Sequence, residues 1–209
     1  MKTSILLLTL SVFLHAATIN VPIDYLTIQD AIDAANHNDV IVIANNEYVE
    51  NLTINNKSIT LLGQDSSQTI INGSGSTTLT IVGDNVTIDN LSFTNAADGI
   101  SVYGTALIQN CRFTFCVDGI DYESGGGECL YNYFSDNADD AIDLDGSLDI
   151  HISNNIIIDN NDDGIEIRLH HYTGDLLTYR IENNYSPVQK VCNIAIKNMA
   201  RKGFISLKF

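Results

Sequence analysis

Apolar and polar residues alternate over short stretches of this chain, and Asn, Asp, Gly or Ser separates one stretch from the next. Clear examples are the segments 40–43, 52–54, 59–62, 79–81 and 86–88. A period of two places successive side chains on opposite faces, which is typical of half-buried β-strands. The separating residues favour tight or left-handed turns. The pattern predicts many short strands joined by compact turns.

A longer repeat is superimposed on this alternation in the middle of the chain. Each copy carries an apolar residue, then Asn at a turn, and closes on Asp-Gly-Ile or Asp-Ala-Ile. The closing residues are Ile100, Ile120, Ile142 and Ile165, spaced 20, 22 and 23 residues apart. A period of this size without a helical pattern inside it indicates coils that stack on one another. Because crossovers between parallel strands are nearly always right-handed, we predict an all-β, single-stranded right-handed parallel β-helix.

Stacking makes equivalent residues of successive coils neighbours, about 4.8 Å apart. We expect Phe93 to stack on Phe113 and the closing isoleucines to form an interior ladder. We expect Asn90, Asn110 and Asn132 to form a polar ladder at a turn, because side-chain amides can bond the coil above or below. The Gly before three of the isoleucines suits a turn that needs a positive φ.

One helix is predicted at the N-terminal end of the repeats. Thr27 is a suitable N-cap for the segment 28–35, and the pattern ends near Asn36. Its apolar residues at positions 28, 31, 32 and 35 define one face. A helix laid across the first coil covers a strand edge that would otherwise template aggregation. We therefore expect an N-terminal capping α-helix near residues 27–36.

The two ends of the chain differ from the repeats. Residues 1–17 combine Lys2, a short apolar run over 5–14 and small residues at positions 16 and 17, which is the pattern of an export signal. A buried N-terminal strand is the alternative interpretation. The signal predicts a secreted, periplasmic or cell-surface protein, with the β-helix domain over 18–186. Residues 187–209 form an atypical basic segment, interpreted as a cap, a membrane-facing piece or the mark of a truncated chain.

Charge and cysteine content constrain the partners. The formal net charge is −16, and all 26 acidic residues lie between Asp24 and Glu182. An acidic body repels nucleic acid and anionic lipid, so we expect no nucleic-acid partner and membrane contact only through the basic C-terminal segment. The 4 cysteines have no CxxC spacing, so pairing and burial as free thiols both stay open. The oligomeric state is not indicated.

Several segments resemble a known fold family. The segments 25–35, 39–43, 47–51 and 57–61 are similar to the N-terminal cap and first coils of secreted proteins with the pectin-lyase-like fold. The later Asn…Asp-Gly-Ile repeats resemble the β-helix coils of the same superfamily. The resemblance implies the β-helix fold. It leaves the function broad, because the superfamily contains polysaccharide lyases, hydrolases, esterases and surface adhesins.

Counting from each closing Ile aligns two outward columns on the strand that follows. The first column reads Ser101, Asp121, Asp143 and Glu166, and the second reads Tyr103, Glu123, Asp145 and Arg168. Acidic side chains and one Arg are therefore expected to crowd one exposed strand face. Like charges that close raise each other's pKa or recruit a cation. Oxygen ligands from neighbouring strands suit Ca²⁺.

The resemblance implies roles for this face. In lyases of the fold, acidic residues hold calcium beside a basic residue, which makes Ca²⁺ the expected cofactor. The corresponding ligands here are Asp121, Asp143, Asp145 and Glu166. Arg168 would neutralise charge or assist proton removal against a uronate. The related hydrolases use clustered aspartates as acid and base, which makes Asp143 a catalytic candidate.

Two further residues complete the substrate-binding set, and one more is a catalytic candidate. Tyr103 and Glu123 lie in the second column with Arg168 and are candidates to contact substrate. His170 follows Arg168 closely and is a candidate general base at neutral pH.

The acidic columns have two functional interpretations. The first is an exported protein that engages a polysaccharide or surface glycan, as a calcium-dependent lyase or a hydrolase. The second is a non-catalytic surface or extracellular scaffold or adhesin, because outward positions of a soluble β-helix are polar in any case. The column at positions 98, 118, 140 and 163 precedes Gly or Ala and is interpreted as a set of turn-forming aspartates.

Overall fold

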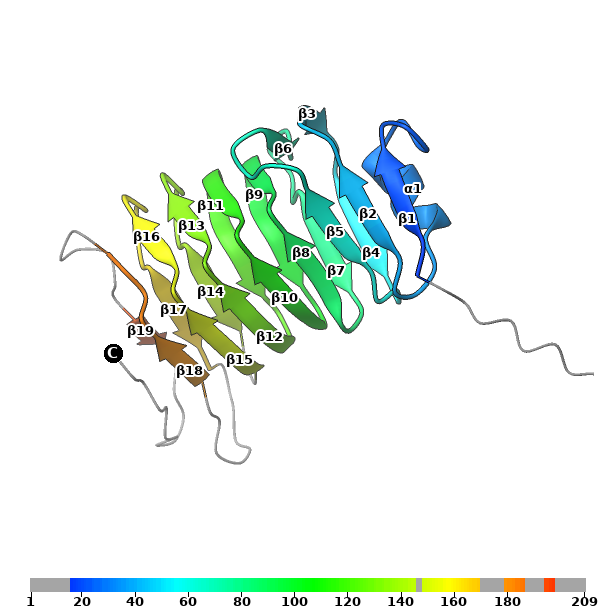
Figure 1. The fold of residues 1–209 in the computed structure, drawn as a ribbon. Helices are drawn as coiled ribbons and strands as arrows, with labels where there is room; N and C mark the ends of the chain where they lie inside the picture. Colours follow the sequence, from blue (N-terminus) through cyan, green and yellow to red (C-terminus); the bar gives the residue numbers. More distant parts are fainter. Residues whose placement is uncertain (1–15, 146–147, 170–178, 187–193, 198–209) are drawn as a thin grey trace, which may run out of the picture.

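The computed structural model describes residues 16–145, 148–169, 179–186 and 194–197. In Figure 1 the chain advances from blue to red as successive coils whose strands lie side by side. The first sheet has 8 strands in the order β1 (Thr18–Val21), β2 (Val40–Ile43), β5 (Thr60–Gly63), β8 (Val86–Asp89), β10 (Thr105–Gln109), β12 (Gly125–Leu130), β15 (Leu148–Ser153) and β18 (Tyr179–Glu182). Residues 1–15 of the predicted export signal, which covers 1–17, lie outside the described part of the chain.

The second sheet has 11 strands. Its main path follows β3 (Asn46–Val49), β6 (Thr69–Asn72), β9 (Ser92–Val102), β11 (Arg112–Tyr122), β14 (Ile142–Asp145), β17 (Ile165–Arg168) and β19 (Ile194–Lys197). Beside this path lie β4 (Leu52–Asn55), β7 (Leu79–Val82), β13 (Tyr133–Ser135) and β16 (Ile156–Ile158). Neighbouring strands of both sheets pair in parallel, for example β8 with β10 and β14 with β17. The predicted parallel β-helix is confirmed.

The interior is built from ladders in which successive coils place the same residue type at equivalent positions, as expected. Ile100 pairs with Ile120, Ile120 with Ile142, and Ile142 with Ile165, and all four side chains are fully buried. The rings of Phe93 and Phe113 stack with centroids 5.2 Å apart, and Phe134 extends the stack at 4.9 Å. Stacked coils therefore bury a continuous apolar core along the axis.

The polar ladder differs from the predicted one by one position. Ile108 pairs with Cys129, so Tyr131 occupies the left-handed turn position equivalent to Asn110, and Asn132 lies inside with 1% exposure. There its Oδ1 accepts the backbone N–H of Cys111 at 2.9 Å. The grouping of Asn132 with Asn90 and Asn110 was therefore wrong, because Asn132 satisfies a buried backbone donor rather than a turn.

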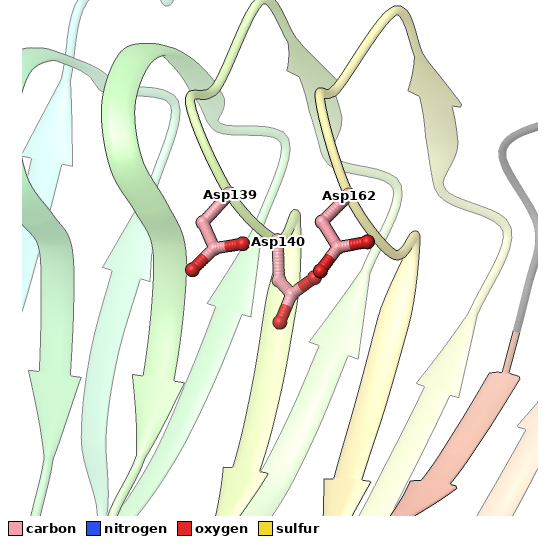
Figure 2. A group of neighbouring side chains, drawn as sticks. All are labelled: Asp139, Asp140 and Asp162. Atoms are coloured by element: carbon pink, nitrogen blue, oxygen red, sulfur yellow. The ribbon is translucent and has the colours of Figure 1, made fainter.

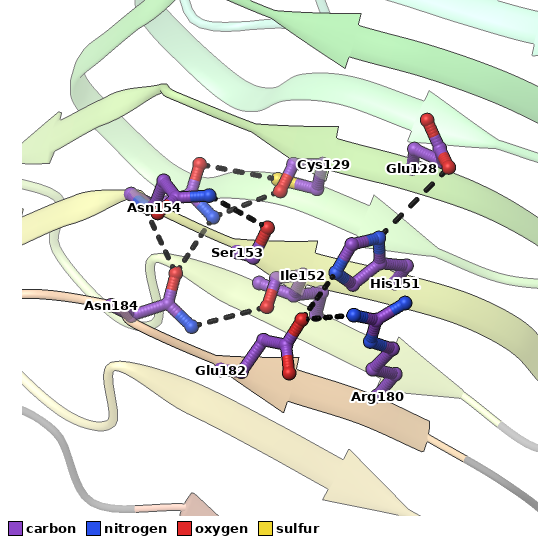
Figure 3. A network of polar contacts seen from close by, with 10 residues as sticks. Glu128, Cys129, His151, Ile152, Ser153, Asn154, Arg180, Glu182 and Asn184 are labelled. Atoms are coloured by element: carbon purple, nitrogen blue, oxygen red, sulfur yellow. Dashed lines mark hydrogen bonds and ion pairs between the residues drawn. The ribbon is translucent and has the colours of Figure 1, made fainter. Parts of the chain in front are cut away.

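The observed amide ladder runs along the interior side of this turn. The backbone N–H of Asn132 donates to Asn155 Oδ1 at 2.8 Å, and Asn155 Nδ2 donates to Asn184 Oδ1 at 2.9 Å. Asn155 Nδ2 also donates to the carbonyl of Cys129 at 2.9 Å. Figure 3 shows Cys129 and Asn184 in this network, beside a separate outward group around His151.

The glycines before the closing isoleucines have a steric role. Neither Gly99 nor Gly119 has a positive φ, so the predicted turn geometry was wrong at these two positions. A Cβ at Gly119 would lie 2.5 Å from the carbonyl oxygen of Ala141 and 2.7 Å from the Phe134 ring. Gly is required there because adjacent coils approach too closely for a side chain.

The N-terminal helix α1 (Ile28–Ala34) covers the first coils, as predicted. The side chain of Thr27 accepts the N–H of Asp30, and Ile28, Ala31 and Ile32 are buried. The helix packs on β1, β2 and β4 at the blue end of the stack (Figure 1). The described helix is too short to span a bilayer.

Three of the four cysteines lie in the described part of the chain, and none of the three forms a disulfide. The free, buried thiols are Cys111, Cys116 and Cys129. Cys192 lies outside the described residues. Burial raises the pKa of each of the three described thiols to about 12, so these groups stay protonated and unreactive at neutral pH.

Candidate functional site

The two outward columns lie in the predicted register. Strand pairing aligns Ser101 with Asp121, Asp121 with Asp143, and Asp143 with Glu166 on β9, β11, β14 and β17. Asp145 pairs with Arg168 in the second column. We call the residues Asp121, Glu123, Asp143, Asp145, Glu166 and Arg168 the acidic face.

Burial divides this face into a covered part and an open part. Asp143 and Glu166 are only 1% and 2% exposed, which corrects the expectation that both are solvent-exposed. They are covered because the guanidinium of Arg168 lies against both carboxylates. Tyr103 and Glu123 are exposed, and the Tyr103 hydroxyl donates to Glu123 Oε1 at 3.1 Å.

Arg168 joins three carboxylates of the acidic face. Its Nε donates to Asp145 Oδ1 at 2.7 Å, and Nη2 donates to Asp143 Oδ2. Its Nη1 lies 3.2 Å from Glu166 Oε2. A planar guanidinium suits this arrangement, because its donors are fixed in a fork that matches carboxylate oxygens. The charge of Arg168 therefore compensates carboxylates that would otherwise be costly to bury.

Asp121 lies next to this cluster in a different electrostatic state. Burial, followed by the charge of Glu123, raises the pKa of Asp121 to about 7. Its Oδ1 is buried and has no hydrogen-bond partner among the described residues, and the same holds for Asp143 Oδ1. Two in-register carboxyl groups thus differ: Asp143 is ion-paired with Arg168, whereas the raised pKa of Asp121 favours its acid form at a higher pH than is usual for an aspartate.

Asp140 joins the site from the turn that precedes β14. Its turn-forming role is present, because its Oδ1 accepts the N–H of Asp163 at 2.7 Å and its own N–H donates to Asp118 Oδ1 at 2.9 Å. In addition, oxygens of Asp140, Asp143 and Glu166 lie within 4.8 Å of one another. Burial, with a smaller contribution from nearby acidic charges, raises the pKa of Asp140 to about 7, although the hydrogen bond from the N–H of Asp163 lowers it.

A second acidic group shares Asp140 and lies toward the outside of the turns. Oxygens of Asp139, Asp140 and Asp162 also lie within 4.8 Å of one another (Figure 2). The sequence signal for Asp140 was the Asp-Asp dipeptide, which occurs as Asp139-Asp140 and again as Asp162-Asp163 before two successive closing isoleucines. The sequence analysis assigned Asp140 to turn formation only and missed its place beside the acidic face.

These oxygens fit a hard cation such as Ca²⁺, which takes carboxylate ligands from flexible sets. A cation would supply a partner for the buried Asp143 Oδ1, which has no hydrogen-bond partner among the described residues. Of the other expected ligands, Asp145 lies on β14 with Asp143, and Asp121 lies on the neighbouring strand β11, where it pairs with Asp143. His170 lies outside the described residues.

Known proteins that are similar to this chain have the same fold. A family model described as "Right handed beta helix region" matches residues 15–185. A search of curated protein sequences finds no match. Solved structures do match. The pectin methylesterase from Aspergillus niger has a TM-score of 0.63 at 17% identity over 92% of this chain and 83% of that chain.

Two further structures extend this similarity. Pectin methylesterase PemA from Erwinia chrysanthemi has a TM-score of 0.59 at 16% identity, over 83% of this chain and 67% of that chain. The PL6 family alginate lyase AlyGC has a TM-score of 0.50 at 14% identity, over 92% of this chain and 38% of that chain. At these identities the similarity shows a shared fold, in agreement with the resemblance to the pectin-lyase-like superfamily.

Proposed function

The chain belongs to the right-handed β-helix family, and from this premise we propose that it is an exported protein that hydrolyses a bond in an acidic polysaccharide at its acidic face. The observation that carries the proposal is the pair of in-register carboxyl groups, Asp121 and Asp143, in unlike states. Pairs of carboxyl groups whose environments separate their pKa values serve as acid and base. Structures of the same fold that are named pectin methylesterases and alginate lyases support polysaccharide as the substrate class.

The roles follow from the contacts. Asp121 has a pKa of about 7 and in its acid form donates a proton to the leaving oxygen. Asp143 acts as the nucleophile or as the base for water through Oδ1, the oxygen without a hydrogen bond in the described part of the chain. Arg168 orients Asp143 through Oδ2. The guanidinium of Arg168 lies against three carboxylates, and an arginine side chain keeps its proton in proteins, so Arg168 is poorly suited to remove a proton.

A cation site is a second candidate feature of this face. As an alternative to the role of Asp143 as nucleophile or base, we propose that Asp140, Asp143 and Glu166 bind Ca²⁺, supported by oxygen atoms that lie within 4.8 Å of one another. When bound, the ion would neutralise carboxylates and attract the carboxylate of a uronate. A rise in melting temperature with Ca²⁺ that EDTA reverses tests this feature. An unchanged melting temperature removes Ca²⁺ from the proposal.

The reaction is tested on polygalacturonate, methyl-esterified pectin and alginate. New reducing ends indicate glycosidic hydrolysis, methanol indicates ester hydrolysis, and ultraviolet-absorbing unsaturated ends indicate a lyase. Asp121→Asn and Asp143→Asn should each lower the turnover at least about a hundredfold. Asp149→Asn is the control, because this acidic side chain is exposed on the other sheet. Absence of all three products, or equal activity in all variants, favours the scaffold or adhesin.

A further inference from the structure

A third outward column crosses β11, β13 and β16, away from the acidic face. Arg112 pairs with Tyr133, Tyr133 with Ile156, and Ile156 with Tyr185. The residue that follows each of the first three is fully buried: Phe113, Phe134 and Ile157. Because side chains alternate along a strand, the column faces outward. We call Arg112, Tyr133, Ile156 and Tyr185 the aromatic strip.

Two members of the aromatic strip are exposed large side chains, and Arg112 and Tyr133 beside them are half-buried. Ile156 is 42% exposed and Tyr185 is 61% exposed, and Tyr131 at the adjacent turn is 60% exposed. The guanidinium carbon of Arg112 lies 4.2 Å from the centroid of the Tyr133 ring. Apolar and aromatic side chains gathered on one surface indicate an interaction site more often than isolated ones do.

The charge of Arg112 indicates the kind of ligand. Arg168 and Arg180 both pair with carboxylates. Arg112 makes no ion pair within the described residues, although the chain has a formal net charge of −16. An arginine that is stacked on a tyrosine and lacks a carboxylate partner is available to an anionic group of a ligand.

We propose that the aromatic strip is a docking site for a polysaccharide that carries carboxylates, aligned with the axis of the β-helix. The apolar faces of the sugar rings stack on Tyr133, Ile156 and Tyr185, and a carboxylate pairs with Arg112. Coils about 4.8 Å apart offer one contact after another to a repeating polymer. The inference goes beyond the proposed reaction and rests on it only for the class of ligand.

The aromatic strip also offers a positive charge to a substrate that the acidic face repels. The acidic face repels an anionic polymer, whereas Arg112 attracts one. Docking on a separate surface raises the local concentration of polymer near the acidic face without requiring new contacts there. Binding at the strip is therefore separable from turnover.

Calorimetry with octamers of galacturonate and guluronate tests this inference, using protein that carries Asp121→Asn so that turnover is at least about a hundredfold slower. Tyr133→Ala and Tyr185→Ala should each raise Kd about tenfold. Arg112→Gln should raise Kd to a similar extent and remove the preference for galacturonate over its neutral methyl-esterified octamer. Phe115→Asn is the control, because Phe115 is 66% exposed outside the strip and has a φ of 57°, which Asn tolerates.

Three results would overturn the inference. The first is a Kd that the strip variants leave unchanged, or that Phe115→Asn raises as much as they do. The second is the absence of saturable binding to both charged octamers. The third is a dimer in sedimentation experiments that Tyr185→Ala dissociates, since a second copy of the chain would then cover the strip. The hydrolytic proposal is judged separately, by the products of the wild-type protein.

Discussion

Replacing Arg168 by Gln is expected to destabilise the β-helix strongly. The substitution removes the cation that contacts Asp143, Asp145 and Glu166. The side chains of Asp143 and Glu166 are each only 2% exposed, so water cannot replace the lost partner fully. The variant therefore contains buried carboxylates without a compensating charge.

The size of the effect follows from this burial. Removing one partner of a buried ion pair costs about 3–5 kcal/mol. The side chain of Arg168 is 33% exposed, so solvent reaches part of the vacated space and the lower value, about 3 kcal/mol, applies. For a domain of this size, each 1 kcal/mol shifts the melting temperature by about 2–4 °C. Arg168→Gln should thus melt about 6–12 °C below the wild type.

Thermal melts followed by circular dichroism at neutral pH measure this shift. Arg180→Gln is the matched control, because Arg180 pairs with Glu182 but is 58% exposed, and its loss should change the melting temperature far less. The triple variant Arg168→Gln, Asp143→Asn, Glu166→Gln should recover most of the loss, because the buried charges are then removed with their partner. An Arg168→Gln protein that melts within about 2 °C of the wild type would refute the reasoning.

Three further predictions concern protonation, the amide ladder and the thiols. Because burial and then Glu123 raise the pKa of Asp121 to about 7, its acid form is lost as the pH rises through that value, and turnover that needs a proton donor should fall above about pH 7; a pH–rate profile that stays flat through this range contradicts the role. Asn155→Ala should lower the free energy of unfolding by about 2–4 kcal/mol, because buried donors and acceptors lose their partners; urea denaturation measures this, with the exposed Asn161→Ala as control, and equal effects of the two would contradict the ladder's role. In a Cys192→Ser background the native protein should not react with a thiol reagent until it is denatured, and rapid labelling before denaturation would disprove the burial of Cys111, Cys116 and Cys129.

Much of the architecture could be predicted from the sequence because the solenoid converts spacing along the chain into contacts. Closing isoleucines about one coil apart predicted the ladder from Ile100 to Ile165, and the same count aligned Asp121 with Asp143 and Glu166. The register predicted by this spacing was wrong at Asn132. Leu130-Tyr131-Asn132 matches the repeat in residue type, but the interior needs an acceptor for the N–H of Cys111 one position further along.

The sequence by itself determined the fold, the register and the strand face on which the acids gather. Only the tertiary structure decided their states, because burial and protonation depend on neighbours from other coils. Arg168 covers Asp143 and Glu166, and a turn brings Asp140 beside them. The aromatic strip has the same origin. Its members are 21, 23 and 29 residues apart and share no residue type beyond two tyrosines, so only the stacking of coils brings them into one line.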